Sequence, residues 1–177
     1  MQMSSKVMKK EEEKMFADFF IGRFNHHYNL DYITRINKDE SVKDSDIDIY
    51  ATAKNRETLN LQIKTGESAL EHFWGFIRKW KKSIGLINNF NIEEQLADII
   101  NKAEQKYSNK EKLILLIGEK MQRVFDEGYT KLISTQHANS AFKGIYLVKL
   151  PFGSADYPYE GQIVAIKGIF RNGGKIF

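Results

Sequence analysis

Two short segments, "SDIDIYATA" at residues 45–53 and "TLNLQIK" at residues 58–64, constrain the fold of this chain more than any other feature. In each segment apolar and polar residues alternate one for one, which is typical of a strand with one face in a core. The polar stretch "KNRE" between them is typical of a turn, so the two segments predict a β-hairpin. Opposed residues in a hairpin have Cβ atoms about 4.5–5.5 Å apart. Asp48 is therefore expected to share one face, at contact distance, with Gln62 and Lys64.

The remaining chain alternates between helical and strand-like patterns. Apolar residues at three- and four-residue spacing predict helices over residues 9–29, 68–87 and 91–107, with a short helix over 120–128. Strands are predicted over residues 30–38, 112–119, 143–150, 162–170 and 174–177. This order predicts an α/β sandwich with a mixed sheet. The 177 residues fit a single domain, with a core at roughly 8–135 and a β-rich C-terminal extension at 136–177.

Composition excludes some kinds of site and leaves others open. The chain contains no cysteine, so neither a disulfide nor a thiolate metal site can form. No apolar run approaches the ~20 residues that span a bilayer. The N-terminal "MQMSSKVMKKEEEK" lacks the apolar core of a signal peptide, so a cytoplasmic protein without membrane contact is expected. A net charge of +4 permits contact with nucleic acid without requiring it.

The first predicted helix carries an acid on its apolar side. Its apolar stripe comprises Met8, Met15, Phe16, Phe19 and Phe20, and steps of 100° per residue place Glu12 near the middle of that stripe. Burying a carboxylate is costly unless the group is paired or binds a metal. Glu12 is therefore a candidate site residue, although a small change in helix phase would bring its neighbours Glu11 or Glu13 there instead.

The order helix, strand, "DIDIYA", turn, "LNLQIK", helix and apolar strand resembles the PD-(D/E)XK nuclease superfamily, which includes restriction endonucleases and Holliday-junction resolvases. In that family an aspartate begins the second core strand, and Asp48 matches it, with Asp46 as a weaker candidate. An acidic residue, any residue and a lysine end the third strand. Gln62-Ile63-Lys64 resembles the QxK variant of that motif. The resemblance covers roughly the first two-thirds of the chain.

The resemblance implies a restriction-endonuclease-like fold, in which a mixed β-sheet core is flanked by helices, and a hydrolase activity. The protein would be a Mg²⁺- or Mn²⁺-dependent endonuclease that cuts phosphodiester bonds in DNA. Asp48, Gln62 and the backbone carbonyl of Ile63 would bind the metal, and Lys64 would orient the attacking water. The family's first-helix glutamate would correspond to Glu12. Because relatives with this fold often dimerise, a homodimer is a further expectation.

A basic cluster in the second predicted helix is a candidate nucleic-acid-binding surface. It consists of Arg78, Lys79, Lys81 and Lys82. Its closeness in sequence to Lys64 favours a groove shared with the site, whereas the alternative is an ordinary solvated helix face.

Three other interpretations remain open at this stage. Asp48 and Lys64 can form a solvated cross-strand ion pair of little energetic consequence. The neutral amide of Gln62, a weaker ligand than a carboxylate, suits a nuclease-fold protein that binds nucleic acid without cutting it. The loop "PFGSADYPYEG", which carries Tyr157 and Tyr159, can instead serve a protein-interaction module.

Overall fold

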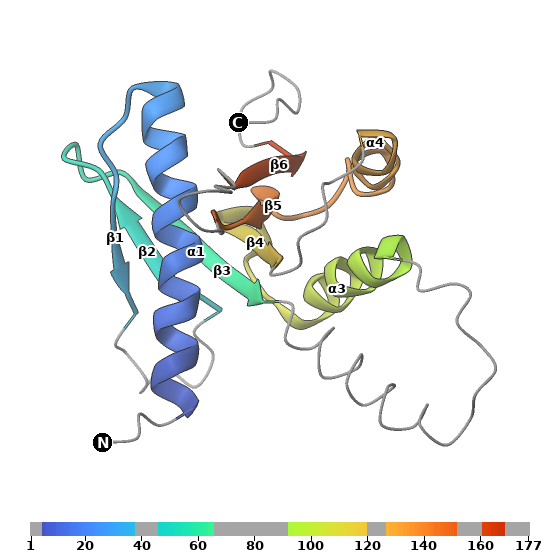
Figure 1. The fold of residues 1–177 in the computed structure, drawn as a ribbon, viewed down its shortest axis with the longest axis horizontal. Helices are drawn as coiled ribbons and strands as arrows, with labels where there is room; N and C mark the ends of the chain where they lie inside the picture. Colours follow the sequence, from blue (N-terminus) through green and yellow to red (C-terminus); the bar gives the residue numbers. More distant parts are fainter. Residues whose placement is uncertain (1–4, 38–45, 66–91, 120–126, 152–160, 169–177) are drawn as a thin grey trace, which may run out of the picture.

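The computed structural model describes residues 5–37, 46–65, 92–119, 127–151 and 161–168 (Figure 1). Its elements, in chain order, are α1 (Ser5–Tyr28), β1 (Ile33–Ile36), β2 (Ile49–Thr52), β3 (Thr58–Thr65), α3 (Ile92–Lys106), the 3₁₀ turn η1 (Lys110–Lys112), β4 (Leu113–Glu119), α4 (Glu127–Gln136), β5 (Gly144–Lys149) and β6 (Gln162–Lys167). No helix within these ranges has both the length and the apolar character needed to cross a membrane.

The strands form one six-stranded mixed sheet in the order β1-β2-β3-β4-β5-β6. Strands β1 to β3 are an antiparallel meander, β3 to β5 run parallel, and β6 returns antiparallel to β5. The predicted hairpin is confirmed, because Ile49 pairs with Leu61 and Tyr50 with Asn60. Its turn contains Arg56 in the left-handed region, with φ 68°. The fold is therefore the predicted mixed α/β sheet.

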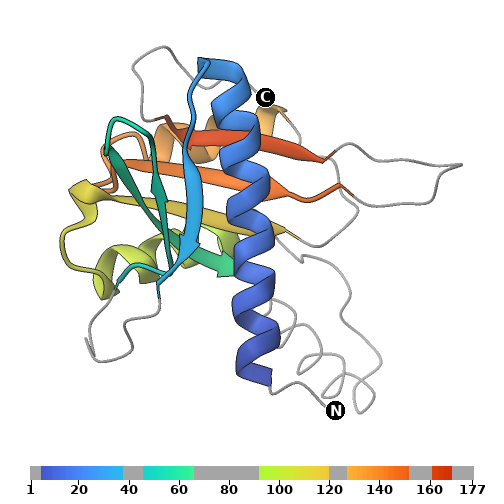
Figure 2. The ribbon, with the colours of Figure 1, turned by 90° about the vertical axis from the view of Figure 1, so that its left-hand side faces the viewer.

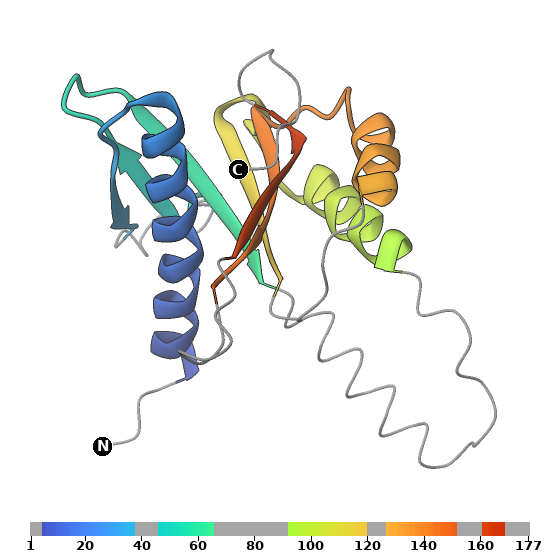
Figure 3. The same ribbon diagram turned by 45° about the horizontal axis from the view of Figure 1, so that its top comes forward.

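Helices cover both faces of the sheet. Helix α1 lies along one face, while α3 and α4 lie on the other (Figures 1 and 3). The sheet has a hydrophobic core on each face, because side chains along a strand point alternately to the two sides. Leu59, Leu61 and Ile63 of β3 pack toward α1, whereas Leu115 and Ile117 of β4 pack toward α3 and α4. Burial on both faces explains why "KLILLIGE" is almost entirely apolar.

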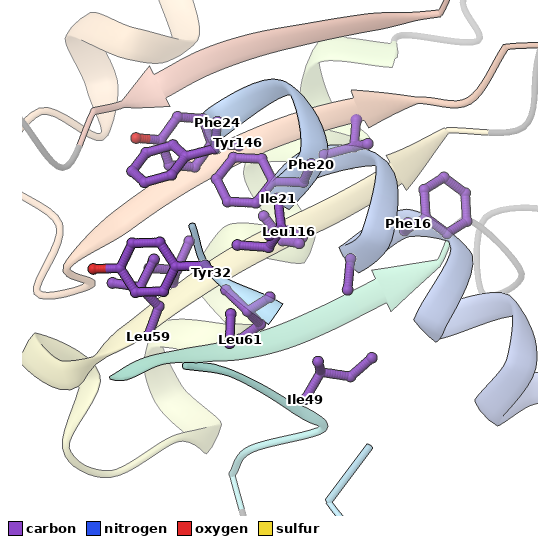
Figure 4. Packing of buried hydrophobic residues seen from close by; sticks show 14 of the residues in the cluster. Phe16, Phe20, Ile21, Phe24, Tyr32, Ile49, Leu59, Leu61, Leu116 and Tyr146 are labelled. Carbon is purple, nitrogen blue, oxygen red and sulfur yellow. The ribbon is translucent and has the colours of Figure 1, made fainter. Parts of the chain in front are cut away.

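Aromatic side chains determine how α1 sits on the sheet. Phe16, Phe20 and Phe24, spaced four residues apart, are buried against the strands (Figure 4). The ring of Phe16 lies so close to Gly118 of β4 that a Cβ there would be 2.7 Å from it. Met15, which the sequence placed in the apolar stripe, is instead 59% exposed, so the buried face is rotated from the predicted one.

The C-terminal part of the chain continues the same sheet. Strand β5 lies beside β4 and β6 lies beside β5; both strands fall within residues 136–177 and contribute to both cores. Residues 120–126, most of the short helix predicted over 120–128, lie outside the described residues, and the structure has a helix at Glu127–Gln136. The predicted helix at 68–87 and strand at 174–177 lie outside the described residues.

Candidate functional site

The site begins where β2 and β3 separate. Their last ladder pair is Ile49 with Leu61, and the Asp48 N–H still donates to the Leu61 carbonyl at 3.0 Å. One residue earlier, the Ile47 carbonyl turns away to accept a hydrogen bond from the Asn37 side chain at 3.0 Å. The next β3 amide on this side therefore has no β2 carbonyl to bond, and a side chain takes that place.

Asp48 supplies that side chain. Its Oδ2 accepts hydrogen bonds from the Ile63 N–H at 2.8 Å and from Gln62 Nε2 at 2.5 Å. Burial raises the pKa of the Asp48 carboxyl, although the Ile63 N–H and the charge of Lys64 oppose that rise. Gln62 is only 4% exposed. The expectation that Asp48 and Gln62 meet on one face of the hairpin is thus confirmed.

Lys64 lies on the same face of β3 as Gln62, and its ammonium group contacts an aromatic ring rather than forming an ion pair with Asp48. None of the salt bridges between described residues joins it to Asp48. Its Nζ instead lies over the Tyr107 ring, 4.9 Å from the centroid. Burial lowers the pKa of Lys64, as does the charge of Lys106, while Asp48 and Glu13 act in the opposite direction. The hairpin therefore does not form the solvated cross-strand ion pair between Asp48 and Lys64.

On α1, Glu13, the neighbour of the predicted Glu12, interacts electrostatically with Asp48 and Lys64. Helix α1 passes the C-terminal end of β3 (Figure 2), and Glu13 is 9% exposed there. Burial, followed by the negative charge of Asp48, raises the pKa of the Glu13 carboxyl to about 7, although Lys9 and Lys64 act in the opposite direction. Glu12 is partly buried as a whole, and its Oε1 atom is buried. Glu13 precedes Phe16 by three residues and Phe20 by seven, a spacing that places all three on one face of the helix. Including Met8 and Met15 in the apolar stripe hides this pattern.

Tyr107, at the end of α3, completes the site and had no part in the sequence-based prediction. It is 6% exposed and packs edge-on against Phe142, with ring centroids 6.4 Å apart. The following residue, Ser108, donates to Asp46 Oδ2 from both its N–H and its hydroxyl, each at 3.0 Å. Through these two hydrogen bonds, Asp46 connects the segment before β2 to the end of α3. It holds the Tyr107 ring next to β3.

The other predicted site residues lie outside the described residues. These are the basic cluster Arg78, Lys79, Lys81 and Lys82, and the loop tyrosines Tyr157 and Tyr159. Within the described residues, no three His, Cys, Asp or Glu side chains gather closely enough to hold a metal ion by themselves. A cation at this site would accordingly need amide, carbonyl or water oxygens as well as the two carboxylates.

Comparison with known proteins identifies no relative. The chain matches no protein-family model, no protein of curated function and no solved structure. Its function must therefore be inferred from the residues of this site.

Proposed function

We propose that the protein is a metal-dependent nuclease of the PD-(D/E)XK type that hydrolyses phosphodiester bonds in DNA. The observation that carries the proposal is the convergence of Asp48, Gln62 and Lys64 at the C-terminal end of β3, with Glu13 beside them. The order α1, β1, β2, β3, α3 and β4, with β3 and β4 parallel, further supports it.

The donor set fits a hard divalent cation. Mg²⁺ and Mn²⁺ take oxygen ligands, and Mg²⁺ keeps several of its waters. Asp48 and Glu13 offer two largely buried carboxyl groups, and repulsion from Asp48 adds to the burial that raises the pKa of Glu13. A cation between them would relieve that repulsion. Gln62 now turns its amide nitrogen toward Asp48, so its carboxamide would have to rotate to offer its oxygen. The Ile63 carbonyl, 3.4 Å from that nitrogen, is a further oxygen at the same place.

Each residue of the site would have its own role in phosphodiester hydrolysis. A bound divalent cation would neutralise charge on the phosphate and lower the pKa of a water. Asp48, oriented by the Ile63 N–H, holds one side of the site. Glu13, whose pKa burial raises in the absence of a metal, would hold the cation from the side of α1. Lys64, steadied over the Tyr107 ring, donates to the phosphoryl oxygens as negative charge develops on them.

A cleavage assay tests this proposal. Plasmid, single-stranded and branched DNA, with RNA alongside, are incubated with Mg²⁺ or Mn²⁺ and, separately, with EDTA. Wild-type protein is compared with Lys64→Ala and with the control Lys102→Ala. Lys102 is an exposed α3 residue that pairs with Asp98 at 2.6 Å. Loss of Lys64 should reduce cleavage by about 100-fold or more, because it removes a charged donor to the transition state. Lys102→Ala should cut like the wild type, and equal activity in the Lys64 variant would contradict the proposal.

A second candidate function is DNA binding without cleavage. Its support is Gln62, which is neutral where the family motif has an acid and whose amide satisfies Asp48 without a cation. In that case affinity for DNA would fall steeply with salt, because phosphate contacts release counterions. No cut product would form in Mg²⁺ or Mn²⁺. Metal-dependent cleavage that is lost in Lys64→Ala would eliminate this alternative.

A further inference from the structure

Two more lysines, one on each side of the sheet, lie beside the site. Lys106 of α3 shares the Tyr107 ring with Lys64, its Nζ lying 5.2 Å from the ring centroid. Lys9 of α1 lies one helical turn before Glu13, with Nζ 3.8 Å from its carboxylate. The charges of Lys9 and Lys106 both act on Asp48 and on Lys64. Each ammonium group is therefore close to the centre of the site, although the two helices cover opposite faces of the sheet (Figure 3).

Both lysines differ from their neighbours on the same helices. Lys14 of α1 is hydrogen-bonded to Asp18, and Lys102 of α3 pairs with Asp98 at 2.6 Å. The Lys9 side chain is 59% exposed, and its 3.8 Å separation from Glu13 is longer than a hydrogen bond. Lys106 is likewise exposed, and its recorded contact is with the aromatic ring. Both ammonium groups are thus near the site and open to solvent.

We propose that Lys9 and Lys106 bind the backbone phosphates on either side of the scissile phosphate, so that the DNA strand crosses the C-terminal end of β3 from α1 to α3. This inference rests on the proposed nuclease function. Three lysines stand around two carboxyl groups, and Lys64 lies in the middle of the three. Cations spread across two elements in this way suit an extended polyanion better than a single small anion. Phosphate contacts of this kind fix the position of a strand without reading its sequence.

The salt dependence of DNA binding tests the two contacts. Binding of a fluorescent duplex is measured in EDTA over a range of salt concentrations. Lys9→Ala/Lys106→Ala is compared with Lys14→Ala/Lys102→Ala, which has the same net charge and changes the same two helices. Each lost phosphate contact should reduce the slope of log K against log salt by about 0.9. The first double variant should therefore lose about 1.8 in slope and bind about tenfold or more weakly at low salt. The second should resemble the wild type.

Replacing single DNA phosphates with an uncharged analogue then locates the phosphates that Lys9 and Lys106 contact. Methylphosphonate is placed, one position at a time, on either side of a mapped cut, and cleavage is measured in Mg²⁺. Neutralising the phosphate that Lys106 binds should slow the wild type about tenfold but have no further effect on Lys106→Ala. Lys9→Ala should show the same coupling on the opposite side of the cut.

The possible results separate the two proposals. A wild-type protein that neither binds nor cuts DNA would overturn both the nuclease function and this strand path. Cleavage by the wild type with equal salt slopes in the two double variants would overturn the strand path alone. Methylphosphonate effects that are additive with both lysine substitutions would do the same. Binding of a mononucleotide as tight as that of the duplex would also contradict an extended path.

Discussion

The raised pKa of Glu13 makes a quantitative prediction about stability. In the folded protein the pKa of this carboxyl rises from 4.5 to about 7, mainly because the group is buried and also because Asp48 is near. The folded state therefore binds the proton more tightly than the unfolded chain between these pH values. The stability that this proton gives is fully present below pH 4.5 and is lost as pH rises to about 7.

The size of the effect follows from the shift. Each pKa unit corresponds to about 1.4 kcal/mol, so the full shift sets an upper limit of about 3 kcal/mol. Replacing Glu13 with Gln keeps the shape of the side chain and removes its ionisation. The variant should match the wild type near pH 4 and exceed its free energy of unfolding by about 2 to 3 kcal/mol above pH 7.

Urea unfolding, followed by circular dichroism from pH 4 to pH 8.5, measures this difference. Glu11→Gln is the control, because Glu11 is an exposed acid on the same helix. That variant should keep the wild-type pH dependence. Saturating Mg²⁺ at pH 8 should restore part of the lost stability in the wild type and less in Glu13→Gln, since a ligand that binds the folded state stabilises it. Parallel stability curves for the wild type and Glu13→Gln across the whole range would refute the reasoning.

Two further predictions concern contacts of aromatic rings. Tyr107→Phe keeps the ring face beneath Lys64 and should keep most of the cleavage rate. Tyr107→Leu should lower kcat about tenfold through loss of the cation–π contact, and equal rates in the two variants would show that the ring does not position Lys64. Gly118→Ala places a Cβ 2.7 Å from the Phe16 ring and should destabilise the protein by about 1–3 kcal/mol in thermal unfolding. Gly22→Ala in α1 meets nothing within 4 Å and should stabilise it slightly, so a similar loss in both variants would contradict the close packing of α1 on β4.

The hairpin and the meeting of Asp48 with Gln62 could be predicted from the sequence because both depend on local patterns. Strict two-residue alternation and a short polar turn leave few choices of register. The face of α1 that is buried is harder to predict from the sequence, because Met15 is as apolar as a core residue yet faces solvent. Counting it in the stripe moved the expected acid from Glu13 to Glu12.

Tyr107 could not be predicted from local patterns at all. It reaches Lys64 because Asp46 holds Ser108, a residue 62 positions later in the chain, and because α3 packs on β4. The helix at Glu127–Gln136 was missed for a related reason. The helical signal around Gly128 is weak, and packing of α4 beside β6 and α3 gives it the stability that its own sequence lacks.

Anomalous diffraction from a crystal soaked in Mn²⁺ tests the central claim most directly. We expect a single strong peak between the carboxylates of Asp48 and Glu13, within coordination distance of both, with the Gln62 carboxamide turned to present its oxygen. The same peak should vanish in crystals of Asp48→Asn. No peak there at a Mn²⁺ concentration that supports DNA cleavage, or a peak that persists in the Asp48 variant, would contradict a metal-dependent nuclease site at the end of β3.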